Sequence, residues 1–335
     1  MKVLVTGGAG YVGSVSVEAL VAGGHAVVVL DDLSTGHGWV DLAGARLVHG
    51  SYADQATVAR LLRDDGIDAV LHCGARSLIG ESMADPGLYY RNNVVGGIAL
   101  LEAMREAGVL RLVISSTAAV YGAPETTPIR EDAPLRPINP YGETKRTLEA
   151  AASWYGSAYG LRSVFLRYFN VAGASVRNGE VHTPEAHLIP NILAAAAGGP
   201  PLTLNGDDYP TPDGTPIRDY LHVEDLADAH LAALESTAPG DARTDAPLAC
   251  NLGAGQGSSN REVLAAAERV VGRSIPHTIG PRRAGDPPIL VAAIDRARDV
   301  LGWTPRRSAL EEMIGSAWAW RQAHPERFTA HGSSA

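Results

Sequence analysis

The sequence predicts an α/β protein built on a doubly wound parallel sheet, with a smaller C-terminal lobe. Three observations carry this prediction. Short runs of valine, leucine and isoleucine alternate with longer helical patterns through residues 2–169, the first run leads directly into a glycine-rich turn, and an aspartate ends the second run. Continuous apolar runs separated by helices are typical of parallel strands that are buried on both faces and joined by right-handed crossovers.

Six strands are predicted in the first half, each from an apolar run that a polar or glycine-containing segment ends. They cover residues 2–6, 25–31, 46–50, 69–74, 110–116 and 161–169. Helical patterns fill the connections at residues 11–23, 54–65, 86–107 and 140–159. Gly23 and Gly24 end the first of these helices, and Pro140 suits the first turn of the last one.

The amino-acid composition of the chain changes after Phe169. Residues 170–220 are rich in proline, glycine, asparagine and aspartate, which is typical both of binding loops and of surface connections. Helices are predicted at residues 185–197, 223–235, 260–272, 295–301 and 310–324. We interpret this half as a smaller lobe that contributes to a cleft at the carboxyl ends of the strands.

Composition excludes several classes of protein. The chain has 335 residues, of which 45% are hydrophobic and 19% charged, and this rules out a wholly disordered or fibrous protein. A net charge of −9 disfavours broad binding to nucleic acid or to a membrane surface. Cys73 and Cys250 alone form neither a disulfide framework nor a zinc site, so no metal is predicted. Because no apolar run is long enough to span a membrane and no leader pattern opens the chain, a cytoplasmic location is expected.

A glycine-rich turn joins the first predicted strand to the first helix. Glycines at this spacing allow a tight turn and let backbone N–H groups approach a pyrophosphate at the helix N-terminus. Asp31, at the end of the second strand, can accept both hydroxyls of a ribose and repels a 2′-phosphate. The sequence therefore predicts a Rossmann-type site for NAD rather than NADP. The residues predicted to contact the cofactor here are Gly7, Gly10, Tyr11, Val12, Gly13 and Asp31.

Tyr141 and Lys145 stand four residues apart at the start of a predicted helix, so their side chains share one face. An ammonium group beside a phenol, together with a cationic nicotinamide, lowers the tyrosine pKa toward neutrality and makes the phenolate a usable base. The chain has only two lysines, Lys2 and Lys145, which argues against a chance pair. A hydroxyl from residues 115–117, at the end of the fifth strand, would complete a triad, although such residues also serve as caps and turn formers.

The glycine turn, the hydroxyl-rich strand end and the Tyr141-x-x-x-Lys145 pair together resemble the extended short-chain dehydrogenase/reductase family. Further segments narrow the resemblance, over essentially the whole chain, to the UDP-glucose 4-epimerases within that family. The most specific segment is residues 208–222, with the sequence DYPTPDGTPIRDYLH. The others are residues 80–82, 89–93, 120–122, 166–170 and 281–283.

The resemblance implies an isomerase of galactose metabolism that interconverts UDP-glucose and UDP-galactose. Hydride leaves and returns at the sugar C4 carbon through a 4-keto intermediate, and tightly bound NAD is regenerated in every turnover. Tyr141 is implied to remove the proton from the 4-hydroxyl, Thr117 to bind the same oxygen, and Lys145 to hold the nicotinamide ribose. Relatives of this kind are generally homodimers joined through two long helices, which correspond here to residues 86–107 and 140–159.

The resemblance also implies the remaining contacts and the division of the chain. We expect an NAD-binding domain at residues 1–169 with a returning segment near 217–240, a lobe that mainly binds the UDP-hexose at residues 170–330, and a tail at 331–335. Two arginines are expected to pair with the diphosphate and an aspartate to hold the uridine ribose. Further cofactor contacts are expected from Asn92, Ser115, Tyr141, Lys145 and Tyr168. Substrate contacts are expected from Thr117, Asn170, Arg218, Tyr220, Arg283, Asp286 and Leu290.

Three positions depart from the pattern of the relatives. Ser51 stands where many of them have an aspartate near the adenine, and Ser77 stands where a lysine is common, with Arg76 just before it. Leu290 stands where a tyrosine excludes N-acetylated sugars and a small residue admits them. The sequence therefore leaves open whether UDP-N-acetylhexosamines are accepted and how the first two positions affect the affinity for NAD.

Three other functions compete with this interpretation. A 4-epimerase acting mainly on UDP-GlcNAc and UDP-GalNAc, or on UDP-pentoses, is the main alternative. A 4,6-dehydratase is disfavoured because Ala118 and Ala119 stand where those enzymes have Asp-Glu after the threonine. A non-catalytic NAD-binding regulator would be expected to have lost Tyr141 or Lys145, and both are present.

Overall fold

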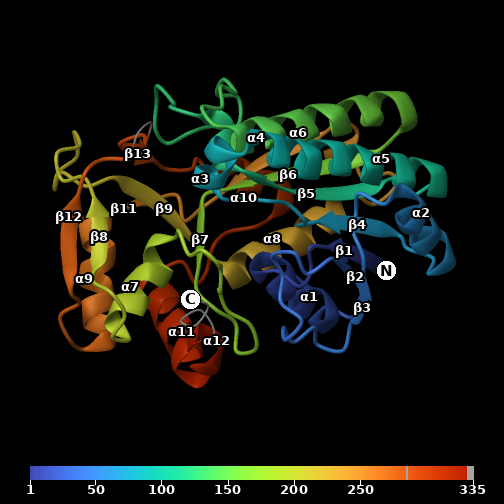
Figure 1. The fold of residues 1–335 in the computed structure, drawn as a ribbon. Helices are drawn as coiled ribbons and strands as arrows, with labels where there is room; N and C mark the ends of the chain where they lie inside the picture. Colours follow the sequence, from blue (N-terminus) through green and yellow to red (C-terminus); the bar gives the residue numbers. More distant parts are fainter. Residues whose placement is uncertain (284–285, 330–335) are drawn as a thin grey trace.

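The centre of the computed structural model, which describes residues 1–283 and 286–329, is a seven-stranded sheet (Figure 1). Its strand order is β10-β6-β5-β4-β1-β2-β3, and every pair is parallel. The predicted doubly wound parallel sheet is therefore confirmed. Its strands are β1 (Lys2–Thr6), β2 (Ala26–Asp31), β3 (Arg46–His49), β4 (Ala69–His72), β5 (Arg111–Thr117), β6 (Arg162–Tyr168) and β10 (Leu248–Leu252).

Helices cover both faces of this sheet (Figure 1). Successive side chains of a strand point to opposite faces, so Val3 and Val5 pack in one core while Leu4 packs in the other. The first core includes side chains of α1 (Tyr11–Ala22), α8 (Val223–Ser236) and α10 (Asp295–Leu301). The second includes those of α2 (Gln55–Asp64), α5 (Gly96–Ala107) and α6 (Pro140–Tyr159).

The sequence pattern predicted one continuous helix at residues 86–107, and the structure divides it. It consists of α4 (Pro86–Tyr89), a π-helical turn η1 (Tyr90–Val95) and α5, with the unpredicted α3 (Ile79–Ala84) before it. The Tyr52 hydroxyl donates to the backbone carbonyl of Asn92 at 3.0 Å, which gives that carbonyl a partner outside the helix. Such π-helical turns often lie at functional sites, and here Asn92 lines the cavity described below.

The second half of the chain also contributes to the central sheet. Strand β10 extends the sheet beyond β6 and carries the buried Cys250, while Cys73 follows β4; both thiols are free. Helix α8 packs beside α1. No helix in the described part of the chain is long and apolar enough to cross a membrane.

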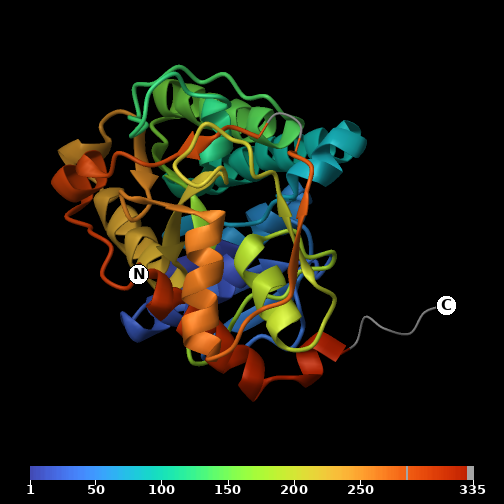
Figure 2. The same ribbon diagram turned by 90° about the vertical axis from the view of Figure 1, so that its left-hand side faces the viewer.

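The smaller lobe has its own core, formed by α7 (Leu188–Ala196), α9 (Asn260–Val271) and α11 (Leu310–Ala323) (Figure 2). One small sheet combines β7 (Asn170–Ala172), β9 (Ile217–His222), β11 (Gly257–Ser259) and β13 (Ile289–Leu290), and β8 (Leu202–Asn205) pairs with β12 (His277–Gly280). The shorter elements are the 3-10 turns η2 (Ala118–Tyr121) and η3 (Ala242–Thr244) and the helix α12 (Glu326–Thr329). The tail expected at residues 331–335 lies outside the described residues.

Candidate active site

A cavity of about 1280 Å³ opens at the carboxyl ends of the central strands, between the sheet and the smaller lobe. Its walls come from the β1–α1 turn, the ends of β5 and β6, the start of α6, and β9 and β13. Pockets for a single small molecule usually measure roughly 300–1000 Å³. The cavity is therefore large enough for two ligands at once, and it lies at the position in which open α/β sheets bind nucleotides.

The glycine turn between β1 and α1 forms the floor of this cavity. A Cβ atom on Gly13 would lie 2.1 Å from the Gly7 carbonyl oxygen, and one on Gly7, whose φ is +70°, would lie 2.5 Å from Gly74. Side chains are therefore excluded, and the turn presents backbone N–H groups and the N-terminus of α1 to the cavity. This cradle, which a Cβ would fill, fits a dinucleotide pyrophosphate.

Asp31 ends β2 beside this turn. Its two carboxylate oxygens accept the backbone N–H groups of Ala9 at 2.9 Å and Leu33 at 2.8 Å. Burial raises the pKa of this carboxyl group, and the two hydrogen bonds partly offset that effect. The carboxylate is thus held rigidly at the cavity wall, in the position expected of a ribose acceptor.

Tyr141 lies in the first turn of α6, on the face that lines the cavity. The Asn139 side chain caps the helix by accepting the Gly142 N–H at 2.8 Å, and Pro140 occupies the first turn. A Cβ on Gly142 would lie 2.5 Å from the Ala119 carbonyl oxygen, so glycine lets α6 approach the turn that follows β5. This approach places the Tyr141 hydroxyl beside the Thr117 side chain, and both residues line the cavity.

Lys145 lies one helical turn further along α6 and is 3% exposed. Its Nζ atom donates to the Ser115 backbone carbonyl at 2.7 Å, and burial lowers the pKa of the ammonium group to about 8. Burial raises the pKa of Tyr141 to about 12, and the neighbouring Thr117 side chain only partly opposes this. The helix therefore places the two side chains on one face, but burial, and not the ammonium group, is the main influence on the phenol pKa.

A buried ion pair supports this helix from behind. The Arg167 guanidinium on β6 binds the Glu149 carboxylate on α6 with a shortest N–O distance of 2.6 Å, and both side chains are at most 6% exposed. The Ser116 hydroxyl also donates to Glu149. Because losing one partner of such a pair leaves a charge buried without compensation, this contact fixes the position of α6 against β5 and β6.

The far end of the cavity holds the residues expected to bind the second nucleotide. Arg218 on β9 pairs with Asp286 and donates to the Pro287 carbonyl at 2.7 Å. Leu290 pairs with Arg218 in the register of β9 and β13. The Tyr220 hydroxyl is buried and has no hydrogen-bond partner within the described residues, which suits contact with a polar ligand.

Nearly all residues predicted from the sequence line this one cavity. They are Gly7, Gly10, Tyr11, Val12, Gly13, Asp31, Asn92, Thr117, Tyr141, Lys145, Tyr168, Asn170, Arg218, Tyr220, Arg283, Asp286 and Leu290. Ser115 is the exception, because its side chain is buried behind the wall and donates to the Cys73 sulfur at 3.3 Å. Of the positions that depart from the relatives, Arg76 and Ser77 line the cavity and Ser51 does not.

Sequence reasoning missed Asp219, the neighbour of Arg218. Its buried carboxylate accepts the backbone N–H groups of Ala254 at 2.6 Å, Gly255 at 3.1 Å and Ala292 at 3.0 Å. Burial raises the pKa of Asp219 to about 6 despite these bonds. It ties two distant loops to β9, and its place between Arg218 and Tyr220, two residues expected to bind the substrate, is the signal that could have identified it.

Comparisons with known proteins agree with this geometry. The sequence model of the "NAD dependent epimerase/dehydratase family" matches residues 3–249. The UDP-glucose 4-epimerase of Lactobacillus helveticus is 50% identical over 331 residues, covering 98% of this chain and 99% of that protein. The crystal structure of UDP-glucose 4-epimerase from Brucella ovis in complex with NAD superposes with a TM-score of 0.90 at 44% identity, covering 95% of this chain and 97% of that one.

A second solved structure was obtained with two ligands. UDP-glucose 4-epimerase from Bifidobacterium longum, in complex with NAD+ and UDP, has a TM-score of 0.92 at 33% identity, covering 98% of this chain and all of that one. The match of the family model over most of the chain, together with full-length identity near one half to a curated relative, establishes the family. This chain belongs to the NAD-dependent epimerase/dehydratase family.

Proposed function

We propose that this protein is an NAD-dependent UDP-glucose 4-epimerase that interconverts UDP-glucose and UDP-galactose. The observation that carries the proposal is the Tyr141 phenol, which lies beside Thr117 and one helical turn from Lys145, in a cavity that has room for two nucleotides. Two full-length relatives that are 50% and 48% identical to this chain are UDP-glucose 4-epimerases, which supports the same conclusion.

The cofactor half of the cavity fits NAD. Gly7, Gly10 and Gly13 would hold the pyrophosphate, Asp31 the adenine ribose, and Lys145 the nicotinamide ribose. When bound, NAD+ supplies a hydride acceptor for the sugar C4 carbon and later a hydride donor.

The proton is handled by residues of this chain. Tyr141 removes the proton from the 4-hydroxyl of the sugar, and Thr117 binds the same oxygen and can relay the proton. After the 4-keto sugar presents its other face, Tyr141 returns the proton to the oxygen. A single base can serve both directions because the oxygen stays near the phenol while the ring turns.

The substrate half must hold the UDP moiety firmly and the hexose loosely. Arg218 and Arg283 would pair with the diphosphate, Asp286 would hold the uridine ribose, and Asn170 would bind the diphosphate or the sugar. Arg218 is 8% exposed and is oriented by backbone carbonyls, so its guanidinium is preorganised for a bidentate contact. The current partner of Arg218, Asp286, would exchange that ion pair for ligand contacts.

The direct test of this function uses the purified protein without added reductant. We expect UDP-galactose and UDP-glucose to reach equilibrium from either side, measured by chromatography of the nucleotide sugars. Accumulation of a 4-keto-6-deoxy sugar would identify a dehydratase instead. Binding of NAD without turnover of any UDP-sugar would identify a non-catalytic regulator.

Replacing Asp31 with asparagine is expected to weaken NAD binding about tenfold and to reduce the preference for NAD over NADP. An amide offers one acceptor oxygen, so one of the Ala9 and Leu33 N–H groups loses its partner, and the negative charge that repels a 2′-phosphate is removed. Fluorescence titration of the cofactor-free protein with each nucleotide measures both effects. Asp64→Asn on the surface of α2 is the matched control, and an unchanged preference in Asp31→Asn would remove Asp31 from this role.

Leu290 is expected to tune acceptance of N-acetylated sugars because it lines the substrate half of the cavity. Leu290→Tyr should lower, and Leu290→Ser should raise, the ratio of kcat/KM for UDP-GlcNAc to that for UDP-glucose, each by about tenfold. The neighbouring Ile289→Val on the same strand does not touch the cavity and should leave the ratio unchanged. If both Leu290 variants keep the wild-type ratio, the size of this side chain does not set specificity.

We also propose the division of the chain given by the sequence, with NAD held mainly by residues 1–169 and the UDP-hexose mainly by residues 170–330. The proposed homodimer would pair α5 and α6 of two copies. These two helices are neighbours (Figure 1). They expose large apolar side chains, including Ile98 of α5 at 40% and Trp154 of α6 at 74%. Sedimentation velocity at micromolar concentration tests this assembly, and a monomer would contradict it. The expected cytoplasmic location stays a prediction.

A further inference from the structure

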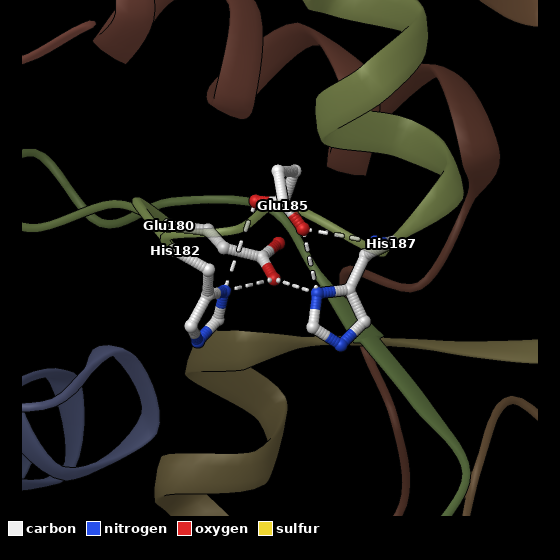
Figure 3. A group of neighbouring side chains, drawn as sticks. All are labelled: Glu180, His182, Glu185 and His187. Atoms are coloured by element: carbon white, nitrogen blue, oxygen red, sulfur yellow. Dashed lines mark hydrogen bonds and ion pairs between the residues drawn. The ribbon is translucent and has the colours of Figure 1, made fainter. Parts of the chain in front are cut away.

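A second cluster of ionisable side chains lies outside the reaction centre. Glu180, His182, Glu185 and His187 all come from the connection between β7 and α7, and they point toward one another (Figure 3). Their spacing reads E-x-H-x-x-E-x-H in the sequence. None of the four has a part in the mechanism above, although Glu180, His182 and His187 border the same large cavity.

The geometry of the cluster matches a closed metal site. The His187 Nδ1 atom lies 2.9 Å from an oxygen of Glu180 and 2.9 Å from one of Glu185, and the His182 Nδ1 atom lies 3.0 Å and 3.8 Å from the same two carboxylates. One ligand atom from each residue falls within 4.8 Å of all the others. In tetrahedral zinc sites with bonds of about 2.0–2.1 Å, neighbouring ligand atoms are roughly 3.3 Å apart, so the observed spacing needs little adjustment.

The burial and the negative charge of the two glutamates both favour a bound cation. The Glu180 side chain is only 7% exposed, and Glu185 is 21% exposed. The largely buried Glu180 carboxylate and the partly exposed Glu185 carboxylate place two negative charges close together, which either two protonated imidazoles or one divalent ion with two neutral imidazoles would neutralise.

The hydrogen bonds favour the ion. The His182 Nδ1 atom is buried and makes no hydrogen bond within the described residues, although Glu180 lies 3.0 Å away. A protonated imidazole at that distance would be expected to direct its N–H at the carboxylate. A buried ring nitrogen that faces two carboxylates without making a hydrogen bond has the arrangement of a metal ligand.

The connection that carries the cluster contacts the first half of the molecule. Upstream in the same connection, Ser175 and Asn178 donate to Glu18 of α1 at 2.8 Å and 2.6 Å. The His182 ring and the ring of Tyr11, the first residue of α1, are nearly perpendicular, with centroids 6.3 Å apart. A cation on α11, Arg321, is attracted to Glu185.

We propose that Glu180, His182, Glu185 and His187 bind one divalent transition-metal ion, preferentially zinc, which anchors residues 173–187 beside the cofactor turn. Two imidazole nitrogens and two carboxylate oxygens form a ligand set that zinc accepts, whereas magnesium and calcium prefer oxygen alone. With four protein ligands the site is closed, so the ion has a structural role. The proposed metal site differs from the expectation drawn from the sequence, which was that no metal is bound.

The test measures metal directly and needs no enzymatic activity. Tag-free holoprotein is treated with a chelator, re-equilibrated with Zn²⁺ or Co²⁺, and freed of excess metal. We expect one zinc per chain by mass spectrometry, and intense visible bands of tetrahedral Co²⁺. The variants Glu180→Gln and His187→Asn should each lose both signals, while His49→Asn, an exposed histidine on β3, should keep them. His187 is more exposed than Glu180, so His187→Asn tests the site without disturbing a buried group.

Thermal unfolding supplies a second measurement. Zinc should raise the Tm of the chelator-treated wild type and of His49→Asn, and it should leave the Tm of His187→Asn unchanged. Wild-type protein that takes up no zinc, or cluster variants that bind as much zinc as the wild type, would overturn the proposal and show that shared protons hold the cluster together. Neither result bears on epimerase activity, which is measured separately.

Discussion

Replacing Tyr141 with phenylalanine is expected to lower kcat for UDP-galactose epimerisation by about a thousandfold while the protein keeps its NAD. The substitution removes only the phenolic oxygen, which lies beside Thr117 and is the proposed base for the 4-hydroxyl proton. The glycine turn and Asp31, which would hold most of the cofactor, are untouched. Steady-state assays, with quantification of nucleotide released from the denatured protein, measure the two effects separately.

Tyr159→Phe is the matched control for this prediction. It removes the same atom from an exposed tyrosine at the other end of the same helix, and it should leave kcat unchanged. Loss of NAD together with activity in Tyr141→Phe would show that the hydroxyl supports the fold or the cofactor. Activity within tenfold of wild type would assign the base to another residue.

The pKa of Tyr141 gives this prediction a spectroscopic counterpart. Because burial raises that pKa to about 12, the phenol of the cofactor-free protein should remain protonated at neutral pH. A nearby positive charge, such as an oxidised nicotinamide, should lower the pKa. Ultraviolet difference titration of wild type against Tyr141→Phe, with and without NAD+, is expected to show this downward shift.

Replacing Lys145 with methionine is expected to lower kcat by about a hundredfold and NAD affinity by about tenfold. Methionine has a similar length but no ammonium group, so the Ser115 carbonyl loses its donor and the nicotinamide ribose loses a charged contact. Lys145→Met should therefore lower both kcat and the affinity for NAD, whereas Tyr141→Phe should lower kcat alone. The same assays and nucleotide quantification distinguish the two patterns.

Lys2 is the only other lysine in the chain and provides the control. Its ammonium group lies 3.8 Å from Asp65 at the surface, where an ion pair contributes little, so Lys2→Met should retain activity and cofactor. Full activity in Lys145→Met would contradict the assigned role. A protein that binds NAD normally but turns over slowly would restrict Lys145 to tuning the phenol.

The buried ammonium group also has a consequence for stability. Burial lowers the pKa of Lys145 from 10.5 to about 8, so between these values the unfolded chain binds more protons than the folded one. The free energy of unfolding contributed by this group therefore rises with pH across that window and is lowest below pH 8. Urea unfolding of the cofactor-free protein should show this slope in the wild type, and the slope should be smaller in Lys145→Met.

The local sequence pattern was enough to predict the parts of the molecule that are formed by residues close together in the chain. The helix expected at residues 140–159 is α6 with the same bounds, because Pro140 in its first turn and Gly160 directly after its last residue set its ends locally. The glycine turn has its predicted place between β1 and α1. Tyr141 and Lys145 share a face because helical geometry alone sets their spacing.

The features that the local pattern did not predict depend on contacts between segments far apart in the sequence. Strand β10 joins the central sheet by pairing with β6, which lies far from it in the sequence. The expected helix at 86–107 contains a π-helical turn at the point where Tyr52, from another segment, donates to the Asn92 carbonyl. Similarly, Asp219 matters through three backbone N–H groups from loops far along the chain.

The sequence by itself determined the fold class, the dinucleotide turn and the identity of the proposed base, because each depends on residues close together in the chain. The tertiary structure decided the environment of those residues. It buries Tyr141 enough to raise its pKa, turns the Lys145 ammonium group toward the Ser115 carbonyl, and folds four residues of an irregular loop around one point. Burial and convergence depend on packing between distant segments, which no local pattern encodes.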